Sequence, residues 1–354
     1  MIVSDYSPAI SGGAQLIVEL LREAGTRAGH NLTSVTYKNK VNSRIISPRL
    51  LNVKFIQYVR ELLNPLGVIQ ILYHQIILKP DVIWYHNINN EWSWSVLRFN
   101  LFKSKQIITL HDLSPISRRK LTPNDLANSK NGNFQFGRLK RIRNAWIRLM
   151  LKDITAVGIG KICSLFLTQN QIVLKATIPN RILPCNHTHI SGKIRNSVFF
   201  AGRENLKGLA EIARAVNSST GWKLYLAGDE ILKVFALTYC TEEKINWLGK
   251  LSNAEVQKKI HSLELVAVCS QYFDNYPTIA LEALVHGSIP VTTEVTGVSE
   301  LIAEISPILV QKVGDRPNLE KIREFLDSKP VVTIEVLESI TNVDYQFKQY
   351  MDLI

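Results

Sequence analysis

The sequence has few cysteines, and none of them share a spacing that would suggest they act together. The four are Cys163, Cys185, Cys240 and Cys269, without a C-x-x-C pair. This distribution argues against a structural zinc site and against a dense disulfide framework, so a reducing cytosol is the expected location. His187 and His189 form an H-T-H stretch without a third donor nearby, and no metal site is expected.

The sequence also gives no reason to expect a secretory or membrane-spanning segment. The N-terminus reaches Asp5 without the basic and then apolar regions of a signal peptide. The longest mostly apolar stretch, Gly67–Leu78, contains Gln and His and falls short of the ~20 residues that span a membrane. Any membrane contact is therefore expected to be peripheral, on the inner face of the plasma membrane.

Acidic residues are scarce in the N-terminal half. Residues 1–190 hold 25 Lys and Arg against 9 Asp and Glu, whereas residues 191–354 hold 17 against 21, which gives net charges of +16 and −4. A basic excess of this size favours an anionic partner: acidic lipid, an anionic acceptor or nucleic acid. Because the basic residues lack a recognisable reading motif or aromatic platform, nucleic acid is not expected.

One basic segment, Arg138–Lys152, has apolar residues at near-helical spacing. These are Leu139, Ile142, Trp146 and Leu149. A basic amphipathic helix either lies on an anionic membrane surface or packs its apolar stripe on its own domain, and the sequence leaves both alternatives open.

The length of 354 residues suits two domains, and a hydrophobic fraction of 46% is typical of folded proteins. Short β-branched runs alternate with helical stretches, which predicts parallel sheets with crossover helices. The expected strands are Ile2–Ser4, Leu32–Tyr37, Val82–Tyr85, Ile107–Leu110, Ile154–Val157, Ser197–Ala201, Lys223–Ala227, Ile245–Leu248, Leu265–Cys269 and Ile289–Thr292. The predicted fold class is α/β with two doubly wound domains, 1–188 and 189–334, joined through the breaker-rich Pro184–Asn196. A C-terminal helix, 335–354, is expected to pack back on the first domain.

Three segments follow expected strands and carry candidate ligand-binding residues. Gly12 and Gly13 open the helical stretch Ala14–Ala28, where a glycine backbone and free helix amides suit a phosphate. An ordinary glycine-rich turn explains this pattern equally well, and the G-x-G-x-x-G of nicotinamide-binding proteins is absent. Arg203 and Lys207 follow the strand Ser197–Ala201, where they would neutralise a diphosphate without a metal ion. The alternative is two solvated loop cations.

The third segment runs from Asp274 to Val291. Pro277 suits the first position of a helix, Asn275 or Tyr276 suits its cap, and Gly287 suits its end. Asp274 before the helix and Glu282 within it would accept hydrogen bonds from sugar hydroxyls.

The chain resembles glycosyltransferase family 4 with the GT-B fold over nearly its whole length. The resemblance lies in the order of SGGAQ, KPDVIWYHN, TLHD, AGRENLKG, LYLAGD, NWLGKLS and the D-x7-E stretch that leads into GSIPV and GVSELI. It implies two Rossmann-like domains facing across a cleft, and a retaining, metal-independent, hexosyltransferase-like enzyme without a cofactor. A nucleotide-diphosphate sugar would be the donor and a glycan or lipid-linked molecule the acceptor, in cell-surface polysaccharide synthesis.

The resemblance also implies residue roles. Arg203 and Lys207 would hold the donor diphosphate, and Glu282 the nucleotide ribose. Asp274 stands where the family usually has a Glu facing the donor sugar. The remaining donor-binding positions are Asn275, Tyr276, Pro277 and Thr278, with Gly12 and Gly13 approaching the diphosphate from the other domain.

Histidines close to the expected acceptor side are the last candidates. His111 in TLHD would line the acceptor side near the reacting carbon. His86 and Asn87 are expected to be structural, and the alternative is that they shape the acceptor pocket. Glu300 in GVSELI suits the nucleotide or an ordinary first helical turn. A catalytically impaired GT-B scaffold that partners an active transferase remains the alternative function.

Overall fold

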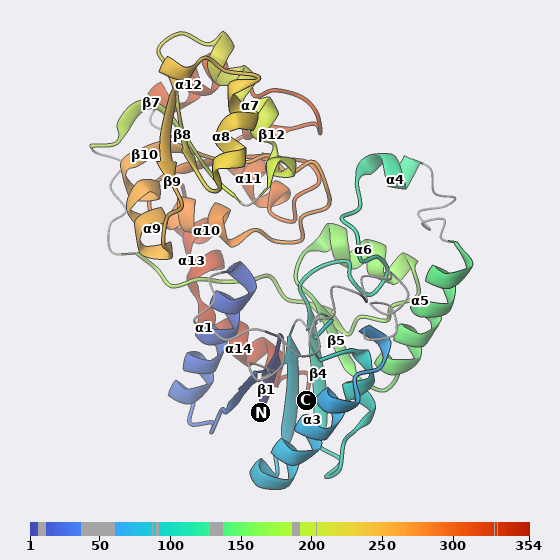
Figure 1. Cartoon of the computed structure of the whole chain (residues 1–354). Helices are drawn as coiled ribbons and strands as arrows, with labels where there is room; N and C mark the ends of the chain where they lie inside the picture. Colours follow the sequence, from blue (N-terminus) through green and yellow to red (C-terminus); the bar gives the residue numbers. More distant parts are fainter. Residues whose placement is uncertain are drawn as a thin grey trace. The chain divides into compact units, whose positions relative to one another are not determined.

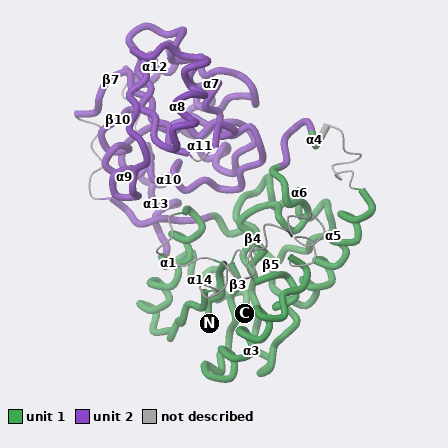
Figure 2. The backbone as a smooth tube through the Cα atoms, viewed as in Figure 1, with its two compact units in different colours: residues 1–120, 125–179, 344–354 green, residues 121–124, 180–343 purple. Residues whose placement is uncertain are grey.

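The computed structural model describes residues 1–5, 12–36, 61–86, 88–89, 92–127, 137–185, 192–202, 204–328, 330 and 332–354. The chain divides into two compact units (Figure 2). Unit 1 holds residues 1–120, 125–179 and 344–354, and unit 2 holds residues 121–124 and 180–343. The main division thus falls between Pro179 and Asn180, where the sequence suggested 188 and 189.

Unit 1 contains a six-stranded parallel sheet in the order β2-β1-β3-β4-β5-β6. Figure 1 labels β1, β4 and β5 of this sheet. Its strands are β1 Ile2–Ser4, β2 Ser34–Thr36, β3 Val82–His86, β4 Lys105–Leu110, β5 Thr155–Gly158 and β6 Ala176–Thr177. All five strands predicted for this half are confirmed with small changes of bounds. The two-residue edge strand β6 was missed because it is too short to produce an alternating pattern.

The helices of unit 1 cover both faces of this sheet. They are α1 Gly13–Arg27, α3 Pro65–Leu78, η2 Trp94–Arg98, α5 Arg138–Leu151, α6 Lys161–Gln169 and α14 Val343–Met351, with α4 Pro123–Ala127 at the division. The chain moves from β1 to β2 in one direction across the sheet. It then moves from β2 to β3, from β3 to β4 and from β4 to β5 in the opposite direction. Right-handed crossovers therefore place α1 on one face and α3, η2 and α5 on the opposite face.

The C-terminal segment differs from the single helix predicted at 335–354. It forms two helices, α13 Ile334–Thr341 and α14, interrupted at Asn342, and only residues from Asp344 onward belong to unit 1. There the Tyr350 ring lies 4.4 Å from the Trp84 ring, and a side chain at Gly25 of α1 would meet Phe347 at 2.7 Å. Helix α14 therefore packs beside α1 on the same face of the sheet.

Unit 2 contains a second six-stranded parallel sheet, in the order β12-β11-β10-β7-β8-β9. Its strands are β7 Ile194–Ala201, β8 Lys223–Ala227, β9 Ile245–Gly249, β10 Leu263–Val268, β11 Ile289–Thr293 and β12 Val310–Gln311. The five strands predicted for this half are confirmed, and the short edge strand β12 was missed. Its helices are η3 Asn205–Lys207, α7 Leu209–Ser218, α8 Glu230–Leu237, η4 Glu242–Lys244, α9 Asn253–Ser262, α10 Thr278–Val285, α11 Ser299–Ile305, η5 Pro307–Leu309, α12 Leu319–Asp327 and α13.

The predicted α/β class with two doubly wound units is confirmed. In unit 2 the strand order reverses between β7 and β10, whose side chains Phe199, Phe200 and Val266 are fully buried. Ligands of open α/β sheets bind beyond the carboxyl ends of the strands at such a reversal. Among the helices that the structure describes, none combines the length and the apolar character needed to cross a membrane.

Candidate functional site

The loops that follow β7 and β10 meet at the reversal of the unit 2 sheet. Gly208 has φ +87°, and a Cβ there would lie 2.1 Å from the carbonyl oxygen of Cys269. The amide of Gln271 donates to the carbonyl oxygen of Leu206 at 2.9 Å. Only glycine fits at position 208, so this residue lets η3 approach the end of β10 closely.

Lys207 and Asp274 form an ion pair at this edge of the sheet. The hydroxyl of Ser270 also donates to Asp274 Oδ2, at 2.8 Å. Burial lowers the pKa of Lys207, but the charge of Asp274 and a contribution from Tyr272 outweigh it and raise that pKa above its ordinary value. Lys207 therefore stays protonated at neutral pH, paired with the Asp274 carboxylate.

The prediction assigned Lys207 and Asp274 to different parts of one ligand, and the structure brings the two side chains into direct contact. Tyr272 adds to the same cluster, because its ring lies 5.4 Å from the Lys207 ammonium and its hydroxyl donates to Glu204 at 3.1 Å. Arg203 lies outside the described residues. Ser270 and Tyr272 were not predicted from the sequence, because they do not belong to a recognisable motif.

The backbone at Asp274 is fixed by the segment after β11. Asp274 forms a parallel bridge with Thr296, and the amide of Gly297 donates to the Asp274 carbonyl oxygen at 2.8 Å. A Cβ at Gly297 would lie 1.5 Å from the carbonyl oxygen of Asn275. The buried hydroxyl of Thr293 donates to the carbonyl oxygen of Ser270 at 2.6 Å. These contacts fix the backbone from which the Asp274 side chain projects.

Helix α10 begins one residue later than predicted. Pro277 occupies the N-cap position with φ −65° and ψ 115°, and Thr278 is the first helical residue, so neither Asn275 nor Tyr276 is the cap. Proline suits this place because its fixed φ is also compatible with an extended ψ. Asn275 is buried, and burial raises the pKa of the Tyr276 hydroxyl to about 12.

Glu282 lies one turn inside α10, on the same side as Thr278. Burial raises the pKa of its carboxyl group, while hydrogen bonds from Gln257 and Thr278 act in the opposite direction. Glu300 lies in the first turn of α11 and is exposed. The half-buried carboxylate of Glu282, held by Gln257 and Thr278, is well suited to accept hydrogen bonds from a diol.

In unit 1, His111 follows β4 and meets His86, the last residue of β3. Nδ1 of His86 lies 2.8 Å from Nε2 of His111. Burial lowers the pKa of His111 to about 4, and burial together with the neighbouring His111 lowers the pKa of His86. Both rings are therefore neutral at pH 7. His86, expected to be structural, is the hydrogen-bond partner of the candidate His111.

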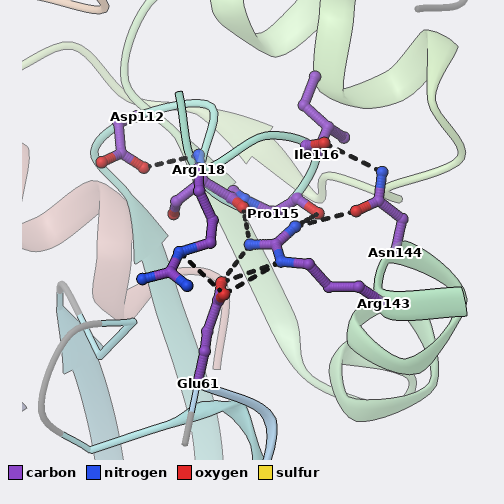
Figure 3. Close-up of polar contacts among 8 residues, drawn as sticks. Glu61, Asp112, Pro115, Ile116, Arg118, Arg143 and Asn144 are labelled. Atoms are coloured by element: carbon purple, nitrogen blue, oxygen red, sulfur yellow. Dashed lines mark hydrogen bonds and ion pairs between the residues drawn. The ribbon is translucent and has the colours of Figure 1, made fainter. Parts of the chain in front are cut away.

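The segment after His111 is held by a buried network that the sequence did not indicate (Figure 3). The Arg143 guanidinium pairs with Glu61 and donates to the carbonyl oxygen of Ser114 at 2.7 Å. Asn144 donates to the carbonyl oxygen of Ile116 at 3.0 Å, and the Asp112 carboxylate accepts from the Ser114 amide at 2.8 Å. Helix α5 thus fixes the backbone beside His111.

Gly12 is the N-cap of α1 and has an extended backbone. A Cβ at this position would meet chiefly the flexible end of the Gln15 side chain, at 2.3 Å. Gly13 is exposed as the first residue of the helix. The fold of unit 1 therefore tolerates a side chain at Gly12, whereas a ligand bound against this helix end would not.

Asn87, His187 and His189 lie outside the described residues. Within the ranges that the structure describes, no group of three or more His, Cys, Asp or Glu side chains is arranged to hold a metal ion.

Comparison with known proteins connects this geometry to a protein family. Residues 192–334 match the family model described as Glycosyl transferases group 1. The match covers less than half of the chain and contains η3, Asp274 and α10. A search of curated protein sequences finds no match.

Solved structures share the fold over nearly the whole chain. Sucrose-phosphate synthase from Thermosynechococcus elongatus has a TM-score of 0.74 and 15% identity, over 99% of this chain and 97% of that one. HepE from Anabaena, in complex with UDP and glucose, has a TM-score of 0.67 and 15% identity, over 99% and 98%. WaaG, a glycosyltransferase involved in lipopolysaccharide biosynthesis, has a TM-score of 0.57 and 14% identity, over 100% and 96%. The fold is therefore that of GT-B glycosyltransferases.

Proposed function

We propose that this chain is a glycosyltransferase that moves a sugar from a nucleotide-diphosphate donor to a glycan or lipid-linked acceptor. The observation that carries the proposal is the Lys207–Asp274 pair at the strand-order reversal of unit 2, within the region that matches Glycosyl transferases group 1. The structures of HepE hold UDP with glucose and UDP-glucose, which supports a nucleotide sugar as donor.

In the proposed reaction the donor separates the Lys207–Asp274 pair. The Lys207 ammonium, protonated at neutral pH, moves to the diphosphate and neutralises charge as it leaves. Asp274, held by Ser270, then accepts a hydrogen bond from a sugar hydroxyl. Glu282 accepts hydrogen bonds from the ribose, and the backbone of residues 275–278 lies beside the sugar and phosphate.

We propose retention of anomeric configuration through attack on the face from which the diphosphate leaves. The acceptor oxygen forms a bond to the anomeric carbon as the bond to the diphosphate oxygen breaks, and the acceptor proton passes to the departing phosphate. Lys207, with Arg203, would supply the positive charge without a metal ion. His111, Gly12 and Gly13 of unit 1 keep the acceptor-side and diphosphate roles that the family resemblance assigns to them.

The setting we propose is cell-surface polysaccharide synthesis in the cytoplasm, with peripheral contact to an anionic membrane. The charge of unit 1 supports the membrane contact, because the basic excess of the chain lies in residues 1–190.

The test is a screen of purified protein against nucleotide sugars with different bases and sugars. A donor that binds the folded state raises the unfolding temperature, and release of its nucleoside diphosphate in the presence of lipid-linked or glycan acceptors reports transfer. Chelator in parallel reactions tests the absence of a metal requirement. A donor that binds without transfer or hydrolysis would favour the alternative, an impaired GT-B scaffold that partners an active transferase. No binding by any nucleotide sugar would contradict both.

A further inference from the structure

Large apolar side chains are exposed along one side of α3 in unit 1. Leu66, Ile69, Tyr73 and Ile76 follow one another at helical spacing and are between 54% and 61% exposed. The opposite side of the helix is buried through Val68, Ile71 and Gln75. The helix is therefore fully folded and still presents an apolar stripe outward.

Helix α5 repeats the arrangement. Leu139, Ile142, Trp146 and Leu149 have the same spacing and are between 38% and 66% exposed. The sequence left open whether this stripe packs on its own domain. It does not, because the inner side of α5 is formed instead by buried residues that include Arg143, Asn144 and Ile147.

The segment that follows η2 joins the two helices. Gln75 of α3 donates to the carbonyl oxygen of Phe99 at 2.7 Å and accepts from the amide of Leu101 at 2.8 Å. On the other side, Arg98 donates to the carbonyl oxygen of Leu149 and lies 3.5 Å from Asp153. The exposed Phe99, Leu101 and Phe102 thus continue the surface from α3 toward α5, on the sheet face that carries both helices.

We call this surface the apolar face of unit 1. It comprises Leu63, Leu66, Ile69, Tyr73, Ile76, Ile77, Phe99, Leu101, Phe102, Leu139, Ile142, Trp146 and Leu149. These are 13 of the 24 exposed large apolar side chains among the described residues, gathered in three short segments. Such a concentration is typical of a docking surface, since single exposed apolar residues are otherwise scattered.

Charge identifies the occupant. Neither α3, α5 nor residues 99–105 contain an acidic residue, while α5 and the adjoining positions expose Arg138, Arg141, Lys152, Lys79 and Lys103. The exposed acids that border these segments are Asp81 and Asp153, and Asp153 is paired with Arg98. A second copy docked by the same face would bring two positive surfaces together. An anionic bilayer offers both an acyl boundary for the apolar side chains and phosphate groups for the cations.

We infer that the apolar face of unit 1 docks on the surface of a bilayer that contains anionic phospholipid. Trp146 and Tyr73 lie at headgroup depth, the aliphatic side chains enter the acyl boundary, and the flanking Arg and Lys side chains contact lipid phosphates. This deepens the proposed function by naming the surface that makes its membrane contact, although docking itself needs no sugar transfer. It has one consequence that rests on that function: α5, whose inner side holds the backbone beside His111, connects the docking surface to the acceptor side (Figure 3).

The test uses the full chain and sedimentation with vesicles of phosphatidylcholine alone or mixed equally with phosphatidylglycerol. We expect binding to the mixed vesicles, little binding to the neutral ones, and a blue shift of Trp146 emission that the Trp146→Phe variant lacks. The double variant Ile142→Glu with Leu149→Glu should bind roughly tenfold more weakly or worse, because two exposed apolar side chains become anionic. Both positions are exposed, so circular dichroism and the unfolding temperature should match the wild type.

The matched control is the same chemical change in unit 2, Ile231→Glu with Val234→Glu, at exposed positions of α8. This variant should bind vesicles as the wild type does. Wild-type affinity of the Ile142→Glu and Leu149→Glu variant, or equal binding to neutral and anionic vesicles, would overturn the inference. The inference would also be overturned if the wild-type protein did not bind vesicles but formed a dimer in sedimentation equilibrium, and the Ile142→Glu and Leu149→Glu variant did not form that dimer.

Discussion

Among the described site residues, two that were predicted separately form an ion pair: Lys207 and Asp274. The two lie 67 positions apart in sequence, and each was predicted from the loop that follows its own strand. Their contact was not predictable, because it depends on Gly208 bringing η3 against the end of β10. In the reaction we propose, the donor diphosphate would take over the cation that is paired here with the Asp274 carboxylate.

Replacing Lys207 with Ala should lower transfer by about 100-fold, the typical loss when one enzyme group that stabilises charge in the transition state is removed. Lys207→Arg should retain part of the activity. The control is Arg195→Ala. Arg195 is an exposed cation at the opposite end of β7, where it is paired with Asp327. Initial rates of nucleoside diphosphate release measure both. Equal rates for wild type and Lys207→Ala would remove this residue from the reaction.

The histidine pair predicts a pH dependence of stability. His86 and His111 have pKa values below those of the unfolded chain, so the unfolded state binds more protons at mildly acidic pH. Stability should therefore fall as the pH drops from about 6.5, the ordinary histidine value, toward the His111 value of about 4. The variant His86→Leu should lose less stability across this range. Urea midpoints at pH 7.5 and 5.0 test this, and identical pH dependence in both proteins would contradict it.

At the scale of elements, strands were more predictable than contacts. Runs such as VIWY and FFA produced strands because β-branched and aromatic residues fill a buried parallel sheet. The edge strands β6 and β12 have two residues each and carry no periodicity. The Arg143–Glu61 pair escaped prediction for another reason: on sequence alone Arg143 belongs to a basic stripe, and only the tertiary fold turns it inward.

The N-terminus of α1 allows an element-scale prediction. Gly12→Ala should leave the unfolding free energy within about 0.5 kcal/mol of the wild type, because chiefly the end of Gln15 must move. If the donor diphosphate approaches this backbone, the same change should lower transfer about tenfold, mainly through a higher KM. Gly137→Ala, at the N-cap of α5 with nothing within 4 Å, is the control and should change neither quantity. Unaltered kinetics of Gly12→Ala would separate this helix end from the donor.

At the scale of the whole molecule, the chain enters unit 2 briefly at residues 121–124, passes to it again at residue 180 and returns to unit 1 at residue 344. From the sequence we expected two domains and a C-terminal segment that returns to the first. The break at Asn342 was not predictable, because the residues on both sides of it favour helix. The return fixes α14 on unit 1 through aromatic side chains. Thr109 donates to the Tyr350 hydroxyl at 3.3 Å and accepts from the Trp84 indole at 2.9 Å.

Removing this aromatic contact should destabilise one unit selectively. Tyr350 is fully buried against Trp84, so Tyr350→Ala should lower the unfolding free energy of unit 1 by about 3–5 kcal/mol, while Tyr350→Phe, which loses the hydroxyl contact alone, should cost about 1 kcal/mol. Tyr345, exposed on the same helix, provides the control in Tyr345→Ala. Hydrogen exchange can follow the two sheets separately: amides of β3 and β4 should lose protection in Tyr350→Ala, and those of β7 and β10 should keep it. Equal loss in both sheets would mean that the two units unfold together, and unchanged protection would mean that α14 contributes little to unit 1.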